Sequence, residues 1–214
     1  MPIHHHTRAT LQINRAPVLT LWAAVVAERL GFTWEEALTL GRAVAGLNAY
    51  AKGKALGLFT PTPPEVQAQR QAQRGPEPLH VALLHRAVPV TRTDAGLRAL
   101  SKAKPIDPAS VQRYVHSKFG EALDDAYAAM QQLATSRPPE VLAAEAYQLY
   151  EHFRPAIPAG AKGWGATGTL DLEAMRQLAT AGKLAGSTRS AGTPDLTGGG
   201  RRAVRRRQED THDG

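Results

Sequence analysis

Two consecutive helices, predicted between Pro17 and about Ala51, are the feature of this sequence that most limits its fold. Proline suits a first helical turn, where its missing N–H would have no partner, and apolar residues follow Pro17 at helical spacing. Gly31 favours a stop, because glycine adopts the left-handed capping conformation without strain. Thr33 and Glu36 then form the capping-box pattern of a second helix. This segment favours a core made of packed helices.

The composition supports a helical core. Hydrophobic residues make up 43% of the chain but aromatic residues only 6%, so the core is mainly Ala, Leu and Val, which suits close helix packing better than a β-sandwich. Further helix starts are predicted at Asp107 and Asp171, with a break or kink at Gly120. We therefore expect an all-α or nearly all-α fold, with about six helices in one compact domain. One small β-hairpin is allowed, from Val81–Leu84 and Val88–Val90, if its proline faces away from the paired side.

The chain divides into three parts. Residues 1–13 are a predicted flexible N-terminus, residues 14–182 the helical domain, and residues 183–214 a disordered basic tail. Residues 60–78, rich in Pro, Gln, Arg and Ala, are a candidate internal linker. The sequence has no cysteine, which excludes disulfides, thiolate catalysis and Cys-based metal sites. It lacks a membrane-spanning apolar run and a secretory signal, so we expect a cytoplasmic protein without a membrane partner.

The charge of the chain favours an anionic partner. The formal net charge is +7 and the isoelectric point is near 10, which is typical of proteins that bind nucleic acid, anionic lipid or acidic proteins. Arginine pairs well with phosphate, and the tail holds a dense arginine cluster after the tether-like Gly198–Gly200. Its members are Arg201, Arg202, Arg205, Arg206 and Arg207. The alternative is that the tail is a solvated segment that improves solubility.

The segment Gly31–Lys54 partly matches a helix-turn-helix motif. In that interpretation Asn48, Lys52 and Lys54 contact DNA. Glu36 and Arg42 depart from the motif, because they occupy places that are normally apolar. The alternative is one continuous packed helix whose basic end is favoured by the helix dipole.

The loop Gly160–Gly168 contains the spacing G-x-G-x-x-G, which can present backbone N–H groups to a phosphate. No strand precedes it and no βαβ unit surrounds it, so we do not predict a dinucleotide-binding fold. Lys162 remains a candidate anion contact, and Trp164 a candidate plug for a hydrophobic notch or a contact for a partner chain.

Two strings, Ile-Asn-Arg-Ala-Pro-Val-Leu-Thr-Leu-Trp at Ile13–Trp22 and Lys-Gly-Trp-Gly at Lys162–Gly165, resemble stretches of an uncharacterised bacterial protein family. The resemblance spans Ile13–Gly57 and Tyr150–Leu170. It implies one intact fold and carries no mechanism.

No catalytic pattern stands out. The sequence has no H-E-x-x-H, no P-loop and no G-x-S-x-G, and His4–His6 lie in the predicted flexible terminus. We expect no catalytic residue, no metal and no cofactor. Our leading hypothesis is non-enzymatic association with nucleic acid, mainly through phosphate contacts. A helical protein-interaction or oligomerisation module is the alternative, an enzyme without a recognisable motif comes third, and the oligomeric state stays open.

Overall fold

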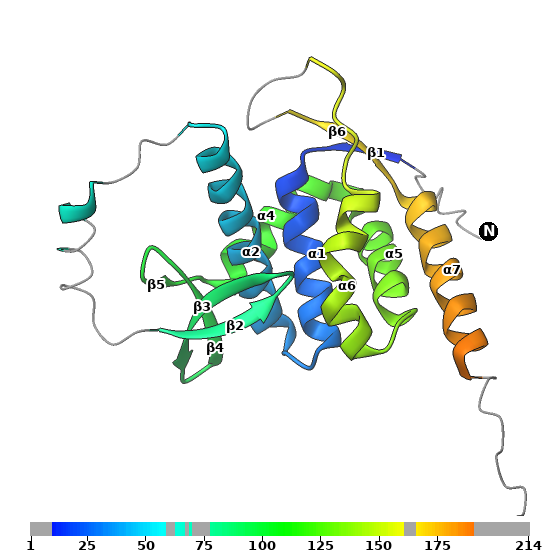
Figure 1. Ribbon diagram of the computed structural model, residues 1–214, viewed down its shortest axis with the longest axis horizontal. Coiled ribbons are helices and arrows are strands. Elements are labelled where there is room, and N and C mark those ends of the chain that lie inside the picture. The colour runs from blue at the N-terminus through cyan, green and yellow to red at the C-terminus, as the bar shows by residue number, and fades with distance from the viewer. Residues whose placement is uncertain (1–9, 59–62, 67–68, 70–77, 161–165, 191–214) are drawn as a thin grey trace, which may run out of the picture.

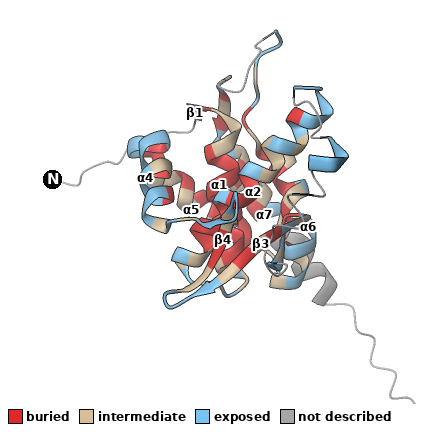
Figure 2. Cartoon of the chain, turned by 90° about the vertical axis from the view of Figure 1, so that its left-hand side faces the viewer, coloured by how far each residue is buried: buried red, intermediate tan, exposed pale blue. Residues whose placement is uncertain are grey.

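A computed structural model describes residues 10–58, 63–66, 69, 78–160 and 166–190. At its centre lies α1 (Arg15–Arg29), in which every residue from Pro17 to Ala27 is buried (Figure 2). A helix that is apolar on all sides has to be enclosed by other elements. The arrangement of the remaining helices follows from the need to cover α1.

Five helices and one short 3-10 turn accompany α1 in the described part of the chain. They are α2 (Trp34–Ala55), α4 (Pro108–Phe119), η1 (Gly120–Ala122), α5 (Leu123–Thr135), α6 (Pro139–Phe153) and α7 (Leu172–Ser190). In Figure 1, α2 lies on one side of α1 while α5, α6 and α7 lie on the other. The Trp22 indole N–H of α1 donates to the Ala146 carbonyl of α6 at 2.8 Å, and Trp22 meets the Phe153 ring edge-to-face. These contacts join α6 to the central helix.

Two antiparallel sheets complete the fold. β2 (Leu79–Leu83), β3 (Arg86–Thr93), β4 (Gly96–Ser101) and β5 (Lys104–Pro105) follow one another in a four-stranded sheet, and β1 (Thr10–Ile13) pairs with β6 (Gly168–Asp171). The prediction of an all-α fold with at most one small hairpin was therefore wrong. The helices were expected, but β4, β5 and the β1–β6 pair were not.

The predicted hairpin is present as β2–β3, with Val81 opposite Val88. β3 is an inner strand, because β4 pairs with its other edge. The β3–β4 pairing stops at Val90, so Pro89, which has no N–H to donate, lies just outside it and keeps His80 of β2 as its partner in the register.

The predicted helix starts and the break were correct. Thr33 and Glu36 form a complete capping box, and Asp107 accepts hydrogen bonds from the N–H groups of Ala109 and Ser110. Gly120, with φ of 55°, separates α4 from α5. Asp171 accepts two backbone hydrogen bonds in the first turn of α7, and this helix continues to Ser190, past the Gly182 boundary predicted from the sequence.

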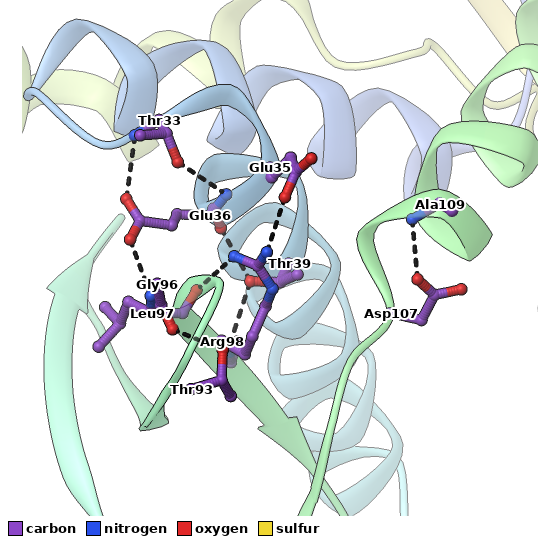
Figure 3. A network of polar contacts seen from close by, with 11 residues as sticks. Thr33, Glu35, Glu36, Thr39, Thr93, Gly96, Leu97, Arg98, Asp107 and Ala109 are labelled. Atoms are coloured by element: carbon purple, nitrogen blue, oxygen red, sulfur yellow. Dashed lines mark hydrogen bonds and ion pairs between the residues drawn. The ribbon is translucent and has the colours of Figure 1, made fainter.

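One carboxylate fastens the sheet to α2. The Glu36 side chain accepts hydrogen bonds from the N–H of Thr33 at 3.0 Å and from the N–H of Leu97 in β4 at 2.8 Å (Figure 3). One turn later, the Thr39 hydroxyl accepts from the N–H of Ala99 at 3.1 Å. The buried Arg98 side chain reaches Glu35 at 2.7 Å. Side chains in the first turns of α2 thus bond to the backbone of β4 and to its Arg98 side chain.

The close packing of α1 on α2 depends on Gly41. A Cβ at Gly41 would overlap the Thr20 carbonyl oxygen and stand 2.9 Å from the Ala24 nitrogen, whereas a Cβ at Gly46 meets nothing within 4 Å. We expect Gly41→Ala to lower the free energy of unfolding by about 1–3 kcal/mol, because a buried helix pair resists overpacking. Gly46→Ala, in the same helix, should raise it by about 0.5–1 kcal/mol through helix propensity. Urea denaturation of both variants measures the difference, and equal effects would contradict this packing.

The Glu36 network predicts a dependence of stability on pH. The hydrogen bond from Leu97 N–H, aided by Thr33, lowers the pKa of Glu36 below its ordinary value of 4.5, although partial burial opposes the shift. A carboxyl group whose pKa is lower in the folded than in the unfolded chain stabilises the fold at pH values above the unfolded pKa. This stabilisation is lost as the pH falls through the folded pKa. Glu36→Gln should therefore be less stable than the wild type near neutral pH, and the two stabilities should converge in acid. Glu140→Gln, at an exposed site, is the control in thermal melts; parallel curves for Glu36→Gln and wild type would contradict the prediction.

Candidate functional site

Charge is divided between two parts of the chain. Residues 34–119 contain 12 Lys and Arg against 6 Asp and Glu, whereas residues 120–182 contain 4 against 8. The first part comprises α2, the four-stranded sheet and α4, and we call it the basic half. The second comprises α5, α6, β6 and α7 as far as Gly182, and we call it the acidic half. Among the described residues, the first part has 10 Lys and Arg against 5 Asp and Glu, and the second has 3 against 8. Because α2 and the sheet lie across α1 from α5, α6 and α7 (Figure 1), these described charges are divided in space as well as along the sequence.

The described exposed cations of the basic half come from four elements. They are Arg42, Lys52 and Lys54 of α2, Arg92 of β3, Lys102 and Lys104 at the β4–β5 turn, and Arg113 and Lys118 of α4. We refer to these eight as the exposed cations. Asp107 lies 3.9 Å from Arg113, but both side chains are exposed, so the ion pair contributes little.

Arg42 is held against the neighbouring helix. Its guanidinium carbon lies 4.5 Å from the centre of the Tyr114 ring, over the ring, which is a cation–π contact between α2 and α4. Such a contact leaves guanidinium N–H groups able to donate to another partner. Arg42 is thus an exposed cation with a defined position on the joint surface of α2 and α4.

The β4–β5 turn presents two lysines. Lys102 and Ala103 have φ of 50° and 63°, so both adopt the left-handed conformation of a tight two-residue hairpin turn. Neither is a glycine, and this conformation is therefore strained. Lys102 and Lys104 are exposed on either side of Ala103. The turn between β4 and β5 lies on the same side of α1 as α2 (Figure 1).

The residues predicted to contact DNA differ in their surroundings. Lys52 and Lys54 are exposed in the last turn of α2. Asn48 is half-buried, and its side-chain oxygen accepts a hydrogen bond at 2.9 Å from Arg86 of β3. Asn48 therefore serves to join α2 to the sheet. α2 is one continuous helix, so it lacks the turn that separates the two helices of a helix-turn-helix.

The other predicted site residues lie outside the described residues. These are the tail cluster of Arg201, Arg202, Arg205, Arg206 and Arg207 and the loop residues Lys162 and Trp164. Within the loop's neighbourhood, Gly168 is described: it starts β6 and packs against the backbone of Ala156.

A second polar cluster lies at the β2–β3 turn. Leu84 and His85 have φ of 46° and 58°, and His85 Nε2 lies 3.1 Å from the Ala144 carbonyl of α6. The His85 ring also lies near that of Tyr147. Burial, followed by the charge of Glu151, raises the pKa of Tyr147. Leu84 in the same turn is buried, at 2% exposed.

Two hollows open to solvent lie on the described surface, one lined by α7 and the other by α1 and α5. Among the described residues, no group of three or more His, Asp or Glu could hold a metal ion. In the same part of the chain, every helix is too short or too polar to span a membrane.

No protein-family model, no curated protein and no solved structure matches this chain. The resemblance to a bacterial family therefore stays a prediction, and the function has to be argued from the charge and geometry of the chain itself.

The Asn48 contact yields a stability prediction. Asn48→Ala should lower the free energy of unfolding by about 1–2 kcal/mol, because the Arg86 guanidinium loses a half-buried acceptor. Asn48→Asp keeps an acceptor and adds an opposite charge, so it should remain as stable as the wild type or exceed it. Chemical denaturation distinguishes them; equal losses for Ala and Asp would mean that the Arg86 contact does not stabilise the fold.

Proposed function

We propose that this protein is a non-enzymatic nucleic-acid-binding protein, whose basic half contacts phosphate groups while the acidic half faces away. The observation that carries the proposal is the separation of charge across α1. The described residues among 34–119 have a net charge of +5 (10 Lys and Arg against 5 Asp and Glu), and those among 120–182 have a net charge of −5 (3 against 8).

A separation of this kind favours a polyanion. Clustered charge of one sign steers an oppositely charged partner toward one side of a protein. The exposed cations come from two helices, a strand and a hairpin turn, so they spread over a surface and do not converge on one point. Phosphates spaced along a backbone suit such a spread, because each lysine or arginine that neutralises a phosphate releases counterions.

The shape of the described surface supports the same proposal. Small-molecule sites are usually concave and bury most of their ligand, whereas the two hollows among the described residues are open to solvent. Phosphate contacts to a nucleic acid need no deep pocket, since the backbone is itself exposed.

The tail extends the proposal. The arginine cluster Arg201–Arg207 would add phosphate contacts after the glycine tether at Gly198–Gly200. In this proposal the basic half determines where the nucleic acid lies, and the tail increases affinity as a second linked site.

A protein-interaction module is a second candidate, because apolar residues are exposed at the end of α2. Leu56 is 62% exposed and Leu58 57%. A partner chain that covers them would account for this exposure.

A salt titration with charge variants tests the proposed function. Replacing Lys52, Lys54, Lys102 and Lys104 by Gln should weaken binding to nucleic acids of unrelated sequence about equally. The log–log slope of affinity against salt should flatten by about 0.7–0.9 for each lysine that contacts phosphate. Fluorescence anisotropy near 50 mM salt suits the measurement, because screening is weak there.

The control replaces the same four lysines by Arg, which preserves charge and should preserve the slope. Replacing Arg201, Arg202, Arg205, Arg206 and Arg207 by Ser, alone and with the Gln variant, separates the tail from the basic half. Absence of binding to both duplex and single-stranded nucleic acid at low salt would contradict the proposal and favour the protein-interaction module.

A further inference from the structure

We infer that, in the free protein, the arginine cluster of the tail docks on the acidic half of its own chain, along the outer side of α7. The occupant is a named segment, Arg201–Arg207. The inference concerns the protein without nucleic acid, so it goes beyond the proposed function and does not depend on it. Three observations carry it: the place where α7 ends, the length of chain that follows α7, and the opposite charges of the two surfaces.

The tail follows α7, which lies on the side of α1 opposite to α2 and the sheet (Figure 1). α5 is the neighbour of α7. A Cβ on Gly182 would stand 2.6 Å from a guanidinium nitrogen of Arg137, which comes just after the end of α5. The two helices therefore run in the same direction, and the chain continues from the end of α7 at Ser190. At that point the acidic half is adjacent, whereas the basic half lies across α1.

The length of the tail allows the cluster to return along α7. Residues 191–200 join Ser190 to Arg201, and a chain advances at most roughly 3.3–3.6 Å per residue, so this link spans at most about 40 Å. From Leu172 to Ser190, α7 is only about 27 Å long at a rise of roughly 1.5 Å per residue. A short link also keeps its two ends at an effective concentration on the order of millimolar. Docking within one chain is thus favoured over docking on a second copy in dilute solution.

The two surfaces have opposite charge. The described residues among 120–182 have 3 Lys and Arg against 8 Asp and Glu, whereas residues 201–207 contain five arginines and no carboxylate. Arginine can pair with a carboxylate through two parallel hydrogen bonds. Single exposed ion pairs contribute little, so the docking depends on several pairs at once and on the short link. While it is docked, the cluster is withheld from other anions.

The described residues around α7 offer acceptors near both of its ends. Glu173 and Thr180 line a hollow on α7 that is open to solvent, although Glu173 also pairs with Arg176 at 3.3 Å. Asp124 is exposed in the first turn of α5, and Glu140 is exposed in the first turn of α6. No described lysine or arginine forms an ion pair with either of these two carboxylates. An arginine-rich segment laid along α7 therefore meets carboxylates from three helices.

The test uses the full chain, which has no cysteine of its own. Ala203→Cys places one thiol inside the cluster for a nitroxide spin label, and NMR measures how far the label broadens each backbone amide signal. At low salt, amides of α5 and α7 should lose most of their intensity while those of α2 and the four-stranded sheet keep theirs, because the broadening falls steeply with distance. Salt near 1 M, where the screening length is about 3 Å, should remove the difference.

The matched control carries the same label and replaces the five arginines of the cluster by Ser, which keeps the length of the tail and should abolish the selective broadening. Asp124→Asn with Glu140→Gln should weaken it, and circular-dichroism melts verify that each variant is folded. A mixture of isotope-labelled protein without the thiol and spin-labelled protein without isotopes detects docking on another copy.

Four outcomes overturn the inference. They are absence of broadening on α5 and α7, equal broadening of both halves, broadening that survives the Ser replacements, and broadening that is as strong in the mixture. None of them bears on nucleic-acid binding, which the salt titration tests separately.

Discussion

The close contact between α1 and α2 at Gly41 is the constraint on which the rest of this structure depends. Because a glycine faces the Thr20 carbonyl oxygen, the two helices approach until their backbones nearly touch. Every residue from Pro17 to Ala27 is buried, and the one hydroxyl among them, on Thr20, donates to the Ala16 carbonyl within α1. The remaining surface of α1 must then be covered by α4, α5 and α6, which places their charged residues on the outside of the molecule.

The position of the sheet depends on the same helix. Glu36 caps α2 and also accepts the N–H of Leu97, so the start of α2 and the strand β4 share one carboxylate. The β4–β5 turn, with Lys102 and Lys104, is thereby carried on the side of α1 where α2 exposes its own cations. The basic half is therefore a result of the fold: residues distant in sequence contribute charge to one side because hydrogen bonds to α2 hold the sheet there.

The parts of the fold that could be predicted from sequence depend on short-range interactions. Thr33, Asp107 and Asp171 each cap a helix by bonding within three residues, so a short string of letters contains the whole signal. β1 and β6 are four-residue strands whose pairing joins Thr10 to Asp171, and no local pattern encodes such a partner. β4 carries Arg98 at a buried position, which hides the alternation of a strand; its burial depends on Glu35 in a distant helix.

The candidate site was only partly visible for the same reason. Lys52 and Lys54 could be recognised because a helix end with two lysines is a local feature. The Arg42–Tyr114 contact, in contrast, joins two helices between which the four strands of the sheet lie in the sequence. In the sequence, Arg42 counted against DNA binding, because it occupied a normally apolar place in a helix-turn-helix. On a continuous α2, the same residue lies outside the core, with its guanidinium over the Tyr114 ring of α4. The residue that counted against a helix-turn-helix therefore joins α2 to α4, and no pattern within a single helix could reveal that contact.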